Sequence, residues 1–367
     1  MAVQKNSSDP SACAPAPILR GRGTAARPDN RFAAWQRAPF DDGWDAAPDA
    51  TAPATELLVD TARHVITFNR SPDVPFDRSI NPYRGCEHGC SYCFARPSHA
   101  YLGLSPGIDF ETRIAFKPDA AAVLRGELAR PGYVCAPIAL GVNTDAYQPV
   151  ERRLGITREI LAVLAATRHP VTLITKSALI ERDADLLAEL ARDALVQVMF
   201  SVTTLDDELA RRMEPRAARP ARRLAAMAKL AAAGIPVGVL FAPLIPALND
   251  HELEAVLEAA RAAGAESGGY VLLRLPHELK DIFSGWLAQH YPGRAQHVMS
   301  VLAQMRGGRA NDPRFGHRMR GEGAFADLYR QRLRRACARL GLNRMRRELN
   351  VALFRPPAEP DAQLALF

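Results

Sequence analysis

The sequence predicts an α/β fold: an open, TIM-like partial (βα)6 barrel with a mostly helical C-terminal extension and a loosely ordered N-terminal segment. Three observations lead to this prediction. From about residue 78 to 276, short apolar stretches alternate with segments whose apolar residues have helical spacing. The stretches are nearly all apolar, which is typical of parallel strands covered by helices on both faces. Six such steps are too few for a closed eight-stranded barrel, so we expect an open, curved sheet.

The predicted strands and helices alternate along the chain. A short strand at 61–69 precedes the main series, which begins with 79–83 and runs directly into a cysteine-containing loop. The later strands are predicted at 137–142, 171–175, 196–202, 237–241 and 269–275, and the helices at 119–130, 157–164, 183–193, 220–233 and 252–263. Because the carboxyl ends of parallel strands share one edge of the sheet, the active site should lie there.

After residue 276 the pattern becomes mostly helical. The segments are an amphipathic stretch at 278–291, a helix at 295–305, a Gly/Arg segment at 306–323 and a helix at 324–340. The predicted domains are a mobile or loosely packed segment 1–55, the barrel 56–277, a helical basic extension 278–355 and a tail 356–367. Within the first segment, Arg20–Gly23 and Asn30–Phe32 are expected to dock onto the main body.

The composition is that of an ordinary globular protein, with 48% hydrophobic and 24% charged residues. No apolar run approaches the roughly 20 residues that span a bilayer, and the N-terminus lacks the apolar segment of a secretory signal. We therefore expect no membrane partner and a cytoplasmic location. Thiols stay reduced in that compartment, where they serve metals or catalysis.

Positive charge is concentrated near the C-terminus. Residues 301–355 contain 14 arginines and only 4 acidic residues, whereas the whole chain carries a net charge of +7. A solvated basic face explains this, and so does a nucleic-acid partner. Arg330, Arg334, Arg335 and Arg339 fall on helical spacing and are the candidate phosphate contacts, although leucines on the same helix also predict packing.

Three of the six cysteines lie in one loop, with the spacing Cys-x3-Cys-x2-Cys: Cys86, Cys90 and Cys93. Three thiolates on a Gly-bearing loop can converge on one metal centre. A closed zinc site would need a fourth ligand, for which His88 and His99 are available. A [4Fe–4S] cluster with three protein ligands would instead leave one iron open to a substrate or cofactor. The cluster is the leading interpretation, and a non-enzymatic zinc module is the remote alternative.

Residues 86–93 resemble the hallmark of the radical S-adenosylmethionine (radical SAM) enzymes, in which an aromatic residue precedes the last cysteine. The resemblance implies a partial (βα)6 barrel with a [4Fe–4S] cluster bound in the loop after the first strand. The open iron would chelate S-adenosylmethionine, and an electron donor of the flavodoxin or ferredoxin type would reduce the cluster. Reductive cleavage would yield methionine and a 5′-deoxyadenosyl radical, which abstracts hydrogen from a substrate.

In this family the cofactor lies across the later strand ends, which here carry polar residues. Lys176 suits the methionyl carboxylate, and Ser201 and Thr203 could bond ribose hydroxyls or the amino acid moiety. Tyr92 could stack near the adenine, and Asn143 begins a segment at the place where the family often grips the substrate amine. A lysine that snorkels to the surface and ordinary strand-end hydroxyls are the alternatives. We assign no catalytic residue from the sequence.

A closer resemblance links the chain to bacterial radical enzymes of unassigned substrate, which are related to spore photoproduct lyase, a DNA-repair enzyme. The residues that carry it are 81–86, 94–97, 143–149 and 174–177. Such lyases need a cysteine near the second strand to return a hydrogen atom. Here Asn143 and Thr144 stand at that strand end, and Cys135 lies at the other end of the strand. The chain departs from the lyases at this position. The resemblance and the basic C-terminal region still make nucleic acid the first candidate substrate for a lyase or modification reaction, and a protein or small metabolite is the alternative.

Overall fold

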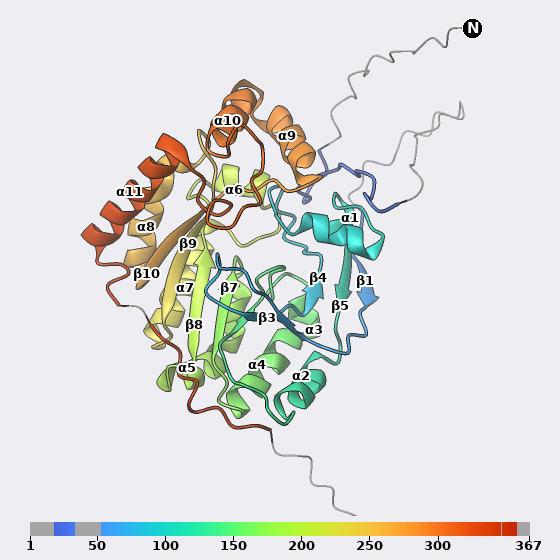
Figure 1. Ribbon diagram of the computed structural model, residues 1–367, viewed down its shortest axis with the longest axis vertical. Helices are drawn as coiled ribbons and strands as arrows, with labels where there is room; N and C mark the ends of the chain where they lie inside the picture. Colours follow the sequence, from blue (N-terminus) through green and yellow to red (C-terminus); the bar gives the residue numbers. More distant parts are fainter. Residues whose placement is uncertain (1–17, 34–52, 346, 358–367) are drawn as a thin grey trace, which may run out of the picture.

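The computed structural model describes residues 18–33, 53–345 and 347–357 and shows a mixed α/β fold (Figure 1). Its main sheet has seven strands in the order β10-β9-β8-β7-β6-β3-β2. The strands are β2 (Ile66–Phe68), β3 (Arg78–Ile80), β6 (Ile138–Leu140), β7 (Val171–Thr175), β8 (Val196–Ser201), β9 (Val237–Leu244) and β10 (Ser267–Leu272). All are parallel except β2, which pairs antiparallel with β3. The predicted α/β class with six parallel strands is confirmed.

The first predicted strand is shorter than expected and is followed by a second, smaller sheet. β3 ends at Ile80 because the next residues include Pro82, which has no N–H to donate to a ladder. β4 (Tyr83–Arg84) pairs antiparallel with β5 (Arg113–Phe116), and β5 pairs in parallel with β1 (Glu56–Val59). The sequence analysis missed β1 and β5 because both are only four residues long.

Helices pack against the main sheet through their apolar faces. They are α2 (Ala120–Leu128), α4 (Ile156–Ala166), α5 (Ala184–Arg192), α7 (Pro220–Ala232) and α8 (Leu253–Ala262). Ile160 and Leu164 of α4, for example, are fully buried together with strand residues such as Leu140 and Val198. This burial forms the core and leaves the carboxyl ends of the strands to the connecting loops. Those loops contain the short helices η1 (Arg96–Leu102), α1 (Asp109–Thr112), α3 (Glu151–Leu154), η2 (Ala178–Asp183), α6 (Asp207–Met213) and η3 (Asp250–Glu252).

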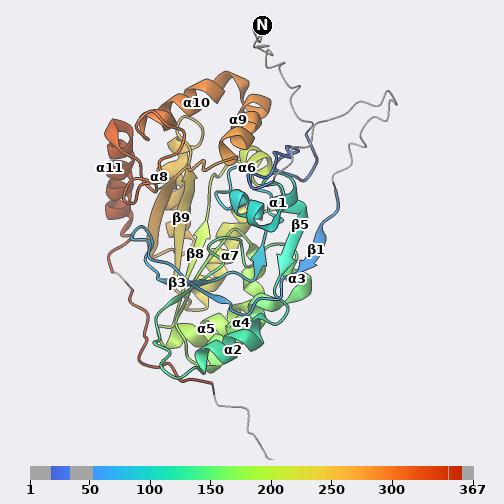
Figure 2. The same ribbon diagram turned by 45° about the vertical axis from the view of Figure 1, so that its right-hand side comes forward.

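The C-terminal extension is helical, as predicted. It comprises α9 (Leu279–His290), α10 (Pro292–Gln304) and α11 (Gly323–Leu340). α11 packs along α8 and β10 on the outside of the sheet, and both views show it beside α8 (Figures 1 and 2). No helix in the described part of the chain is long and apolar enough to cross a membrane.

Residues 18–33, called the strap below, lie against the segment 96–111. The N–H of Ile108 donates to the carbonyl of Ala26 at 2.9 Å, and Asn30 Nδ2 donates to the carbonyl of Ala100 at 2.7 Å. The strap is packed where the sequence analysis expected loose order, because it satisfies backbone groups of the main body. The docking expected of its two short motifs is observed. The rest of the predicted segment 1–55, apart from 53–55, and most of the tail 356–367 lie outside the described residues.

Candidate active site at the cysteine loop

The three predicted cluster cysteines lie in the loop between β4 and η1. Cys86 and Cys90 are buried, Cys93 is half-buried, and all three are free thiols. Burial raises the pKa of Cys86 well above its ordinary value, and the charges of Asp145, Cys90 and Cys93 act in the same direction. Burial also raises the pKa of Cys90 to about 12, although Lys176 opposes this rise. The three thiols therefore lie within electrostatic reach of one another, and iron binding would displace their protons.

The donor set fits an iron–sulfur cluster better than a single metal ion. Among the described residues, no three His, Cys, Asp or Glu side chains are arranged to hold one ion. Tetrahedral zinc, with Zn–S bonds of about 2.3 Å, needs closely converging sulfurs, whereas a cubane spreads its thiolates over separate irons. His88 Nδ1 lies 3.4 Å from Asp145 Oδ2, and His99 Nε2 lies 2.9 Å from the carbonyl oxygen of Arg113. One ring nitrogen of each histidine thus contacts a protein oxygen, and these contacts leave the other nitrogen of each ring uncommitted.

The side chain of Gln148 braces the cysteine loop from the β6 side. It is fully buried. Its Oε1 accepts a hydrogen bond from the N–H of Glu87 at 2.9 Å, and its Nε2 donates to the carbonyl of Gly85 at 3.1 Å. These two backbone groups flank Cys86. A single amide therefore fixes the path of the chain through the first cysteine.

The strap braces the same loop from another side. A Cβ on Gly23 would lie 1.6 Å from the carbonyl oxygen of Gly89, so only glycine fits at this approach. The N–H of Gly23 donates to Glu111 Oε2 at 2.9 Å, and Glu111 forms a fully buried ion pair with Arg96. Arg96 Nε in turn donates to the carbonyl of Cys90 at 2.9 Å. The buried pair thus links the strap to the backbone of a candidate cluster ligand.

Three of the five predicted cofactor residues come together beside the loop: Tyr92, Lys176 and Thr203. The Tyr92 hydroxyl lies 3.2 Å from Thr203 Oγ1 and donates to Glu214. Lys176 Nζ lies 5.8 Å from the centroid of the Tyr92 ring. Asp145 Oδ2 accepts the backbone N–H of Lys176 at 2.8 Å and so fixes the start of this side chain. The strand ends therefore present an ammonium group and an aromatic ring next to the thiols.

The other two predicted cofactor residues, Asn143 and Ser201, lie at the ends of β6 and β8, the two strands that flank β7. The Ser201 hydroxyl donates to the carbonyl of Ala242 at 3.0 Å. The backbone N–H of Asn143 donates to Asn81 Oδ1 at 2.9 Å, which ties the end of β6 to the start of the cysteine loop. The cofactor contacts expected of both side chains stay predictions.

Glu214 and Arg223 form a buried ion pair that the sequence analysis missed. Their side chains are 0% and 1% exposed. Burial acts to raise the pKa of Glu214, but the charges of Arg223 and Lys176 lower it to about 2. Arg223 also donates to the carbonyl of Ser201 at 2.9 Å. A lone glutamate and a lone arginine nine positions apart carry no motif, so the sequence held no signal for this pair.

A cavity of about 550 Å³ lies beside His88. Residues that follow β6, β7 and β8 line it, among them Arg152, Arg182, Arg216 and Arg222. Arg216 pairs with Glu87, the residue after Cys86, at 3.1 Å. Arg182 pairs with Glu151 and Asp183, and Arg222 pairs with Glu181, so most of the positive charge on the cavity wall is neutralised locally.

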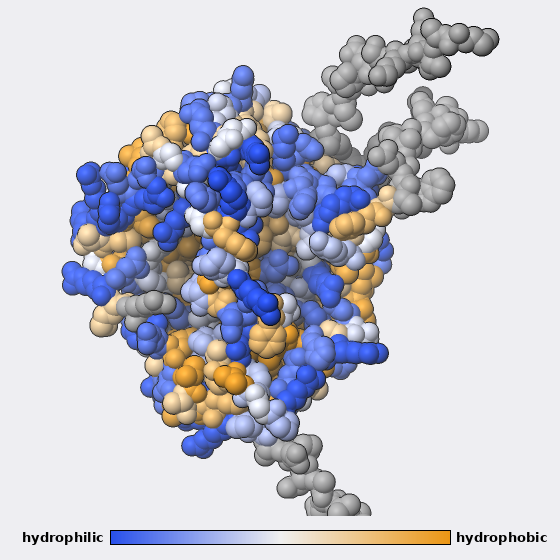
Figure 3. Space-filling view, in the orientation of Figure 1, coloured by the Kyte–Doolittle hydropathy of each residue, from blue (hydrophilic) through white to orange (hydrophobic). Residues whose placement is uncertain are grey.

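The predicted basic face on the last helix is partly neutralised. Two of the four predicted arginines are paired, Arg339 with Glu258 of α8 and Arg330 with Asp327 of α11 itself. Arg332 also pairs with Glu254 of α8, at 2.5 Å. Arg334 and Arg335 are exposed, and hydrophilic side chains cover the outer face of α11 (Figure 3). The helix therefore docks on α8 partly through ion pairs, and its phosphate contacts stay a prediction.

Comparisons with known proteins agree with this geometry. Residues 80–260 match the family model of the radical SAM superfamily. An uncharacterized protein of Mycobacterium tuberculosis, Rv2578c, is 41% identical over 230 residues, which is 61% of this chain and 68% of that protein. An uncharacterized protein of Methanocaldococcus jannaschii is 26% identical over 197 residues, or 54% of this chain and 71% of that protein.

Among solved structures, spore photoproduct lyase has a similar fold. Its complex with dinucleoside spore photoproduct has a TM-score of 0.56 and 16% identity, with 78% of this chain and 80% of that chain covered. A mutant of the lyase with bound AdoMet and dinucleoside spore photoproduct has a TM-score of 0.57 and 16% identity, with the same coverage of 78% and 80%. At this identity the likeness concerns the fold alone. The family match, the relatives and the cysteine loop lead to one conclusion: the chain belongs to the radical SAM superfamily, whose enzymes use a [4Fe–4S] cluster and S-adenosylmethionine.

Proposed function

We propose that this enzyme holds a [4Fe–4S] cluster through Cys86, Cys90 and Cys93 and uses it on S-adenosylmethionine to start radical chemistry on a nucleic-acid substrate. The observation that carries the proposal is the set of three free thiols in one braced loop, with Lys176 and Tyr92 beside it. When bound, the cluster supplies one electron that splits the cofactor into methionine and a 5′-deoxyadenosyl radical, which abstracts hydrogen from the substrate. The open order of the sheet, with β10 and β2 at its edges, supports the partial barrel.

The residues of the chain would bind and orient the cofactor. Lys176 would neutralise the methionyl carboxylate, since its ammonium group stands at a strand end and its backbone is held by Asp145. Tyr92 would line the site with its ring, because Glu214 and Thr203 hold its hydroxyl. Ser201, Thr203 and Asn143 are proposed contacts to the rest of the cofactor on the neighbouring strand ends.

An electron donor of the flavodoxin or ferredoxin type would approach the cavity beside His88. Arg152 is exposed there and Arg216 and Arg222 are also on its wall. Arg216 and Arg222 are paired with Glu87 and Glu181, so the exposed Arg152 is the cation that would attract an acidic protein, since opposite charges speed association. The three free thiols agree with a cytoplasmic location.

The proposed nucleic-acid substrate rests on the similarity to spore photoproduct lyase and on the arginines that line the cavity beside His88. A protein or small metabolite is the alternative substrate, and the pairing of the α11 arginines with Glu254 and Glu258 favours it. Those ion pairs remove part of the basic face on which a nucleic acid would lie.

Anaerobic turnover tests the proposal. The purified chain is reconstituted with iron and sulfide, and iron content and 5′-deoxyadenosine are measured with S-adenosylmethionine and a strong reductant. We expect about four irons per chain and formation of 5′-deoxyadenosine. Cys90→Ala should lose both, whereas Cys337→Ala, which changes a buried cysteine on α11, should keep both. An intact cluster that forms no 5′-deoxyadenosine would refute the radical chemistry.

Deuterium transfer then separates the two substrate classes. Candidate oligonucleotides deuterated in sugar and base are compared with cell extracts depleted of nucleic acid. Deuterium in 5′-deoxyadenosine from an oligonucleotide supports the nucleic-acid assignment. Substrate-dependent turnover in the depleted extract alone would favour the alternative.

A further inference from the structure

Arg274, just beyond the carboxyl end of β10, is an unusual arginine. Its guanidinium lies over the ring of Phe94, with 5.4 Å between the guanidinium carbon and the ring centroid. Phe94 directly follows Cys93 and is 45% exposed. The Nε atom of Arg274 is buried and has no hydrogen-bond partner, and Nη1 reaches only the sulfur of Met319, at 3.7 Å. Within the described chain, no carboxylate forms an ion pair with this cation.

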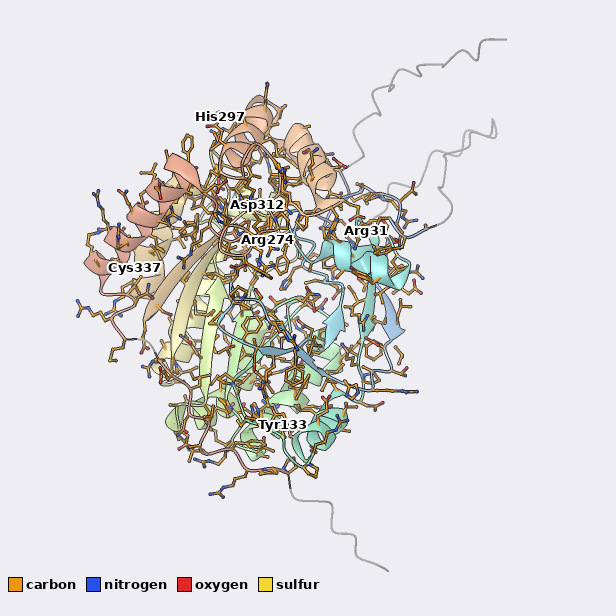
Figure 4. All side chains as sticks on the ribbon, in the orientation of Figure 1. Arg31, Tyr133, Arg274, His297, Asp312 and Cys337 are labelled. Carbon is orange, nitrogen blue, oxygen red and sulfur yellow. The ribbon has the colours of Figure 1, made fainter. Side chains whose placement is uncertain are left out.

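The acidic groups nearby are already occupied by other arginines. Asp73 pairs with Arg318, and Asp312 pairs with Arg314. Figure 4 shows Arg274 and Asp312 below α10, and the charges of both act on Arg306. Each of these carboxylates therefore pairs with another arginine, and among the described residues Arg274 has no ion-pair partner.

Arg306 adds a second excess positive charge behind Arg274. It is 1% exposed, and it donates to the carbonyls of Leu273 and Arg318 rather than to a carboxylate. Burial and the charge of Arg274 lower the pKa of Arg306 to about 10. Asp73 and Asp312 act on these two cations only at a distance, and among the described residues neither arginine has an ion-pair partner. Partly or fully buried cations without such a partner are costly, and an anion bound beside them would lower that cost.

We propose that Arg274 is a binding residue for a phosphate group of a nucleotide substrate, supported from behind by Arg306. A planar guanidinium with free N–H groups matches a phosphate in a bidentate manner. The exposed ring of Phe94 next to it offers a face on which a base can stack, and base stacking beside a cation is the usual pattern of single-strand recognition. This inference rests on the proposed function and moves the substrate contact from α11 to the end of β10, beside Cys93.

Binding of a fluorescein-labelled single-stranded oligonucleotide to the full-length, cluster-loaded chain tests the assignment. Fluorescence anisotropy over a salt series gives the Kd and its salt dependence. Arg274→Gln should raise Kd at least about tenfold and reduce the salt slope by about one phosphate contact. Arg335→Gln, the same change of charge on an exposed residue of α11, should leave Kd within about twofold. Arg274→Lys should fall between, because it keeps the charge and loses the planar fork.

The outcomes separate this inference from the proposed function. Iron content, the visible absorbance of the cluster and the thermal unfolding temperature show whether Arg274→Gln folds and holds its cluster like the unaltered enzyme. If the cluster-loaded enzyme cleaves the cofactor but Arg274→Gln and Arg274→Lys bind the oligonucleotide like the unaltered chain, the phosphate assignment is wrong and the radical function stands. A larger loss from Arg335→Gln than from Arg274→Gln would return the interface to α11. Displacement of the oligonucleotide by a dicarboxylate but not by a nucleoside monophosphate would also overturn the assignment.

Discussion

The contact between Gly23 and Gly89 predicts that cluster loading requires the strap, and Gly23→Ala tests this prediction. The added Cβ would lie 1.6 Å from the carbonyl oxygen and 2.8 Å from the carbonyl carbon of Gly89. These are backbone atoms between Cys86 and Cys90, so no flexible side chain can move aside. The strap must lift, or the cysteine loop must shift.

The expected cost follows from what the displacement breaks. Overpacking costs about 1–3 kcal/mol, and the hydrogen bond from Gly23 to the charged Glu111 contributes about 1.5–3 kcal/mol. The sum of about 2.5–6 kcal/mol is a large part of a typical folding free energy. We therefore expect local release of the strap and poor retention of iron in Gly23→Ala.

The assay compares iron per chain and the visible absorbance of the cluster after anaerobic reconstitution, with thermal unfolding of the apoprotein. Gly21→Ala is the matched control. It lies in the same strap, at a positive φ of 75° that Gly23 does not share, and nothing lies within 4 Å of its added Cβ. It should lose only the roughly 1–2 kcal/mol of backbone strain and retain the cluster. If Gly23→Ala loads as much iron as Gly21→Ala and unfolds at the same temperature, the clamp argument is wrong.

Three further predictions concern the groups around the site. Glu214→Gln should lower the free energy of unfolding in urea by about 3–5 kcal/mol, because it leaves Arg223 buried without its counter-charge. Glu258→Gln removes a carboxylate from an exposed pair and should lower it by less than about 1 kcal/mol. Equal losses of unfolding free energy in the two variants would contradict this prediction. Gln148→Leu should cost about 1–3 kcal/mol for each of two stranded backbone groups and lower iron retention, while the exposed Gln304→Leu should change neither quantity. The hydrogen bond from Arg314 lowers the pKa of Asp312 to about 2, so this carboxylate stabilises the fold above its ordinary pKa of 3.8 and loses that effect as the pH falls toward 2. The gap in unfolding free energy between unaltered chain and Asp312→Asn should therefore narrow over that pH range, and a constant gap would refute the linkage.

Local patterns predicted the fold well because they depend on neighbouring residues. The strands at 171–175 and 196–202 are short, mostly apolar runs, and the structure has β7 at Val171–Thr175 and β8 at Val196–Ser201. Strand β5 was missed because it is only four residues long. The strand predicted at 79–83 was too long because Pro82 ends the ladder.

The candidate site divides in the same way. The cysteine loop, which includes Tyr92, could be predicted because it is a compact motif, and Lys176 and Thr203 could be predicted because they follow the ends of periodic segments. The groups that brace the loop could not be predicted from the sequence. Gln148 and Glu87 are 61 positions apart, and Gly23 and Glu111 are 88 apart, so their pairing has no trace in local composition.

The sequence by itself determined the class of this protein: an α/β sheet of six parallel strands and a three-cysteine loop after the first of them. Hydrophobic periodicity and close motif spacing encode these features, and both act over short stretches of chain. Only the tertiary structure decided which charges are free. In the structure, Arg332 and Arg339 pair with glutamates of α8, and Glu214 is buried against Arg223. Arg274 lies over Phe94 and has no carboxylate partner among the described residues. The physical reason is that a charge is neutralised by whatever the fold brings within a few ångströms, and that neighbour is distant in the sequence.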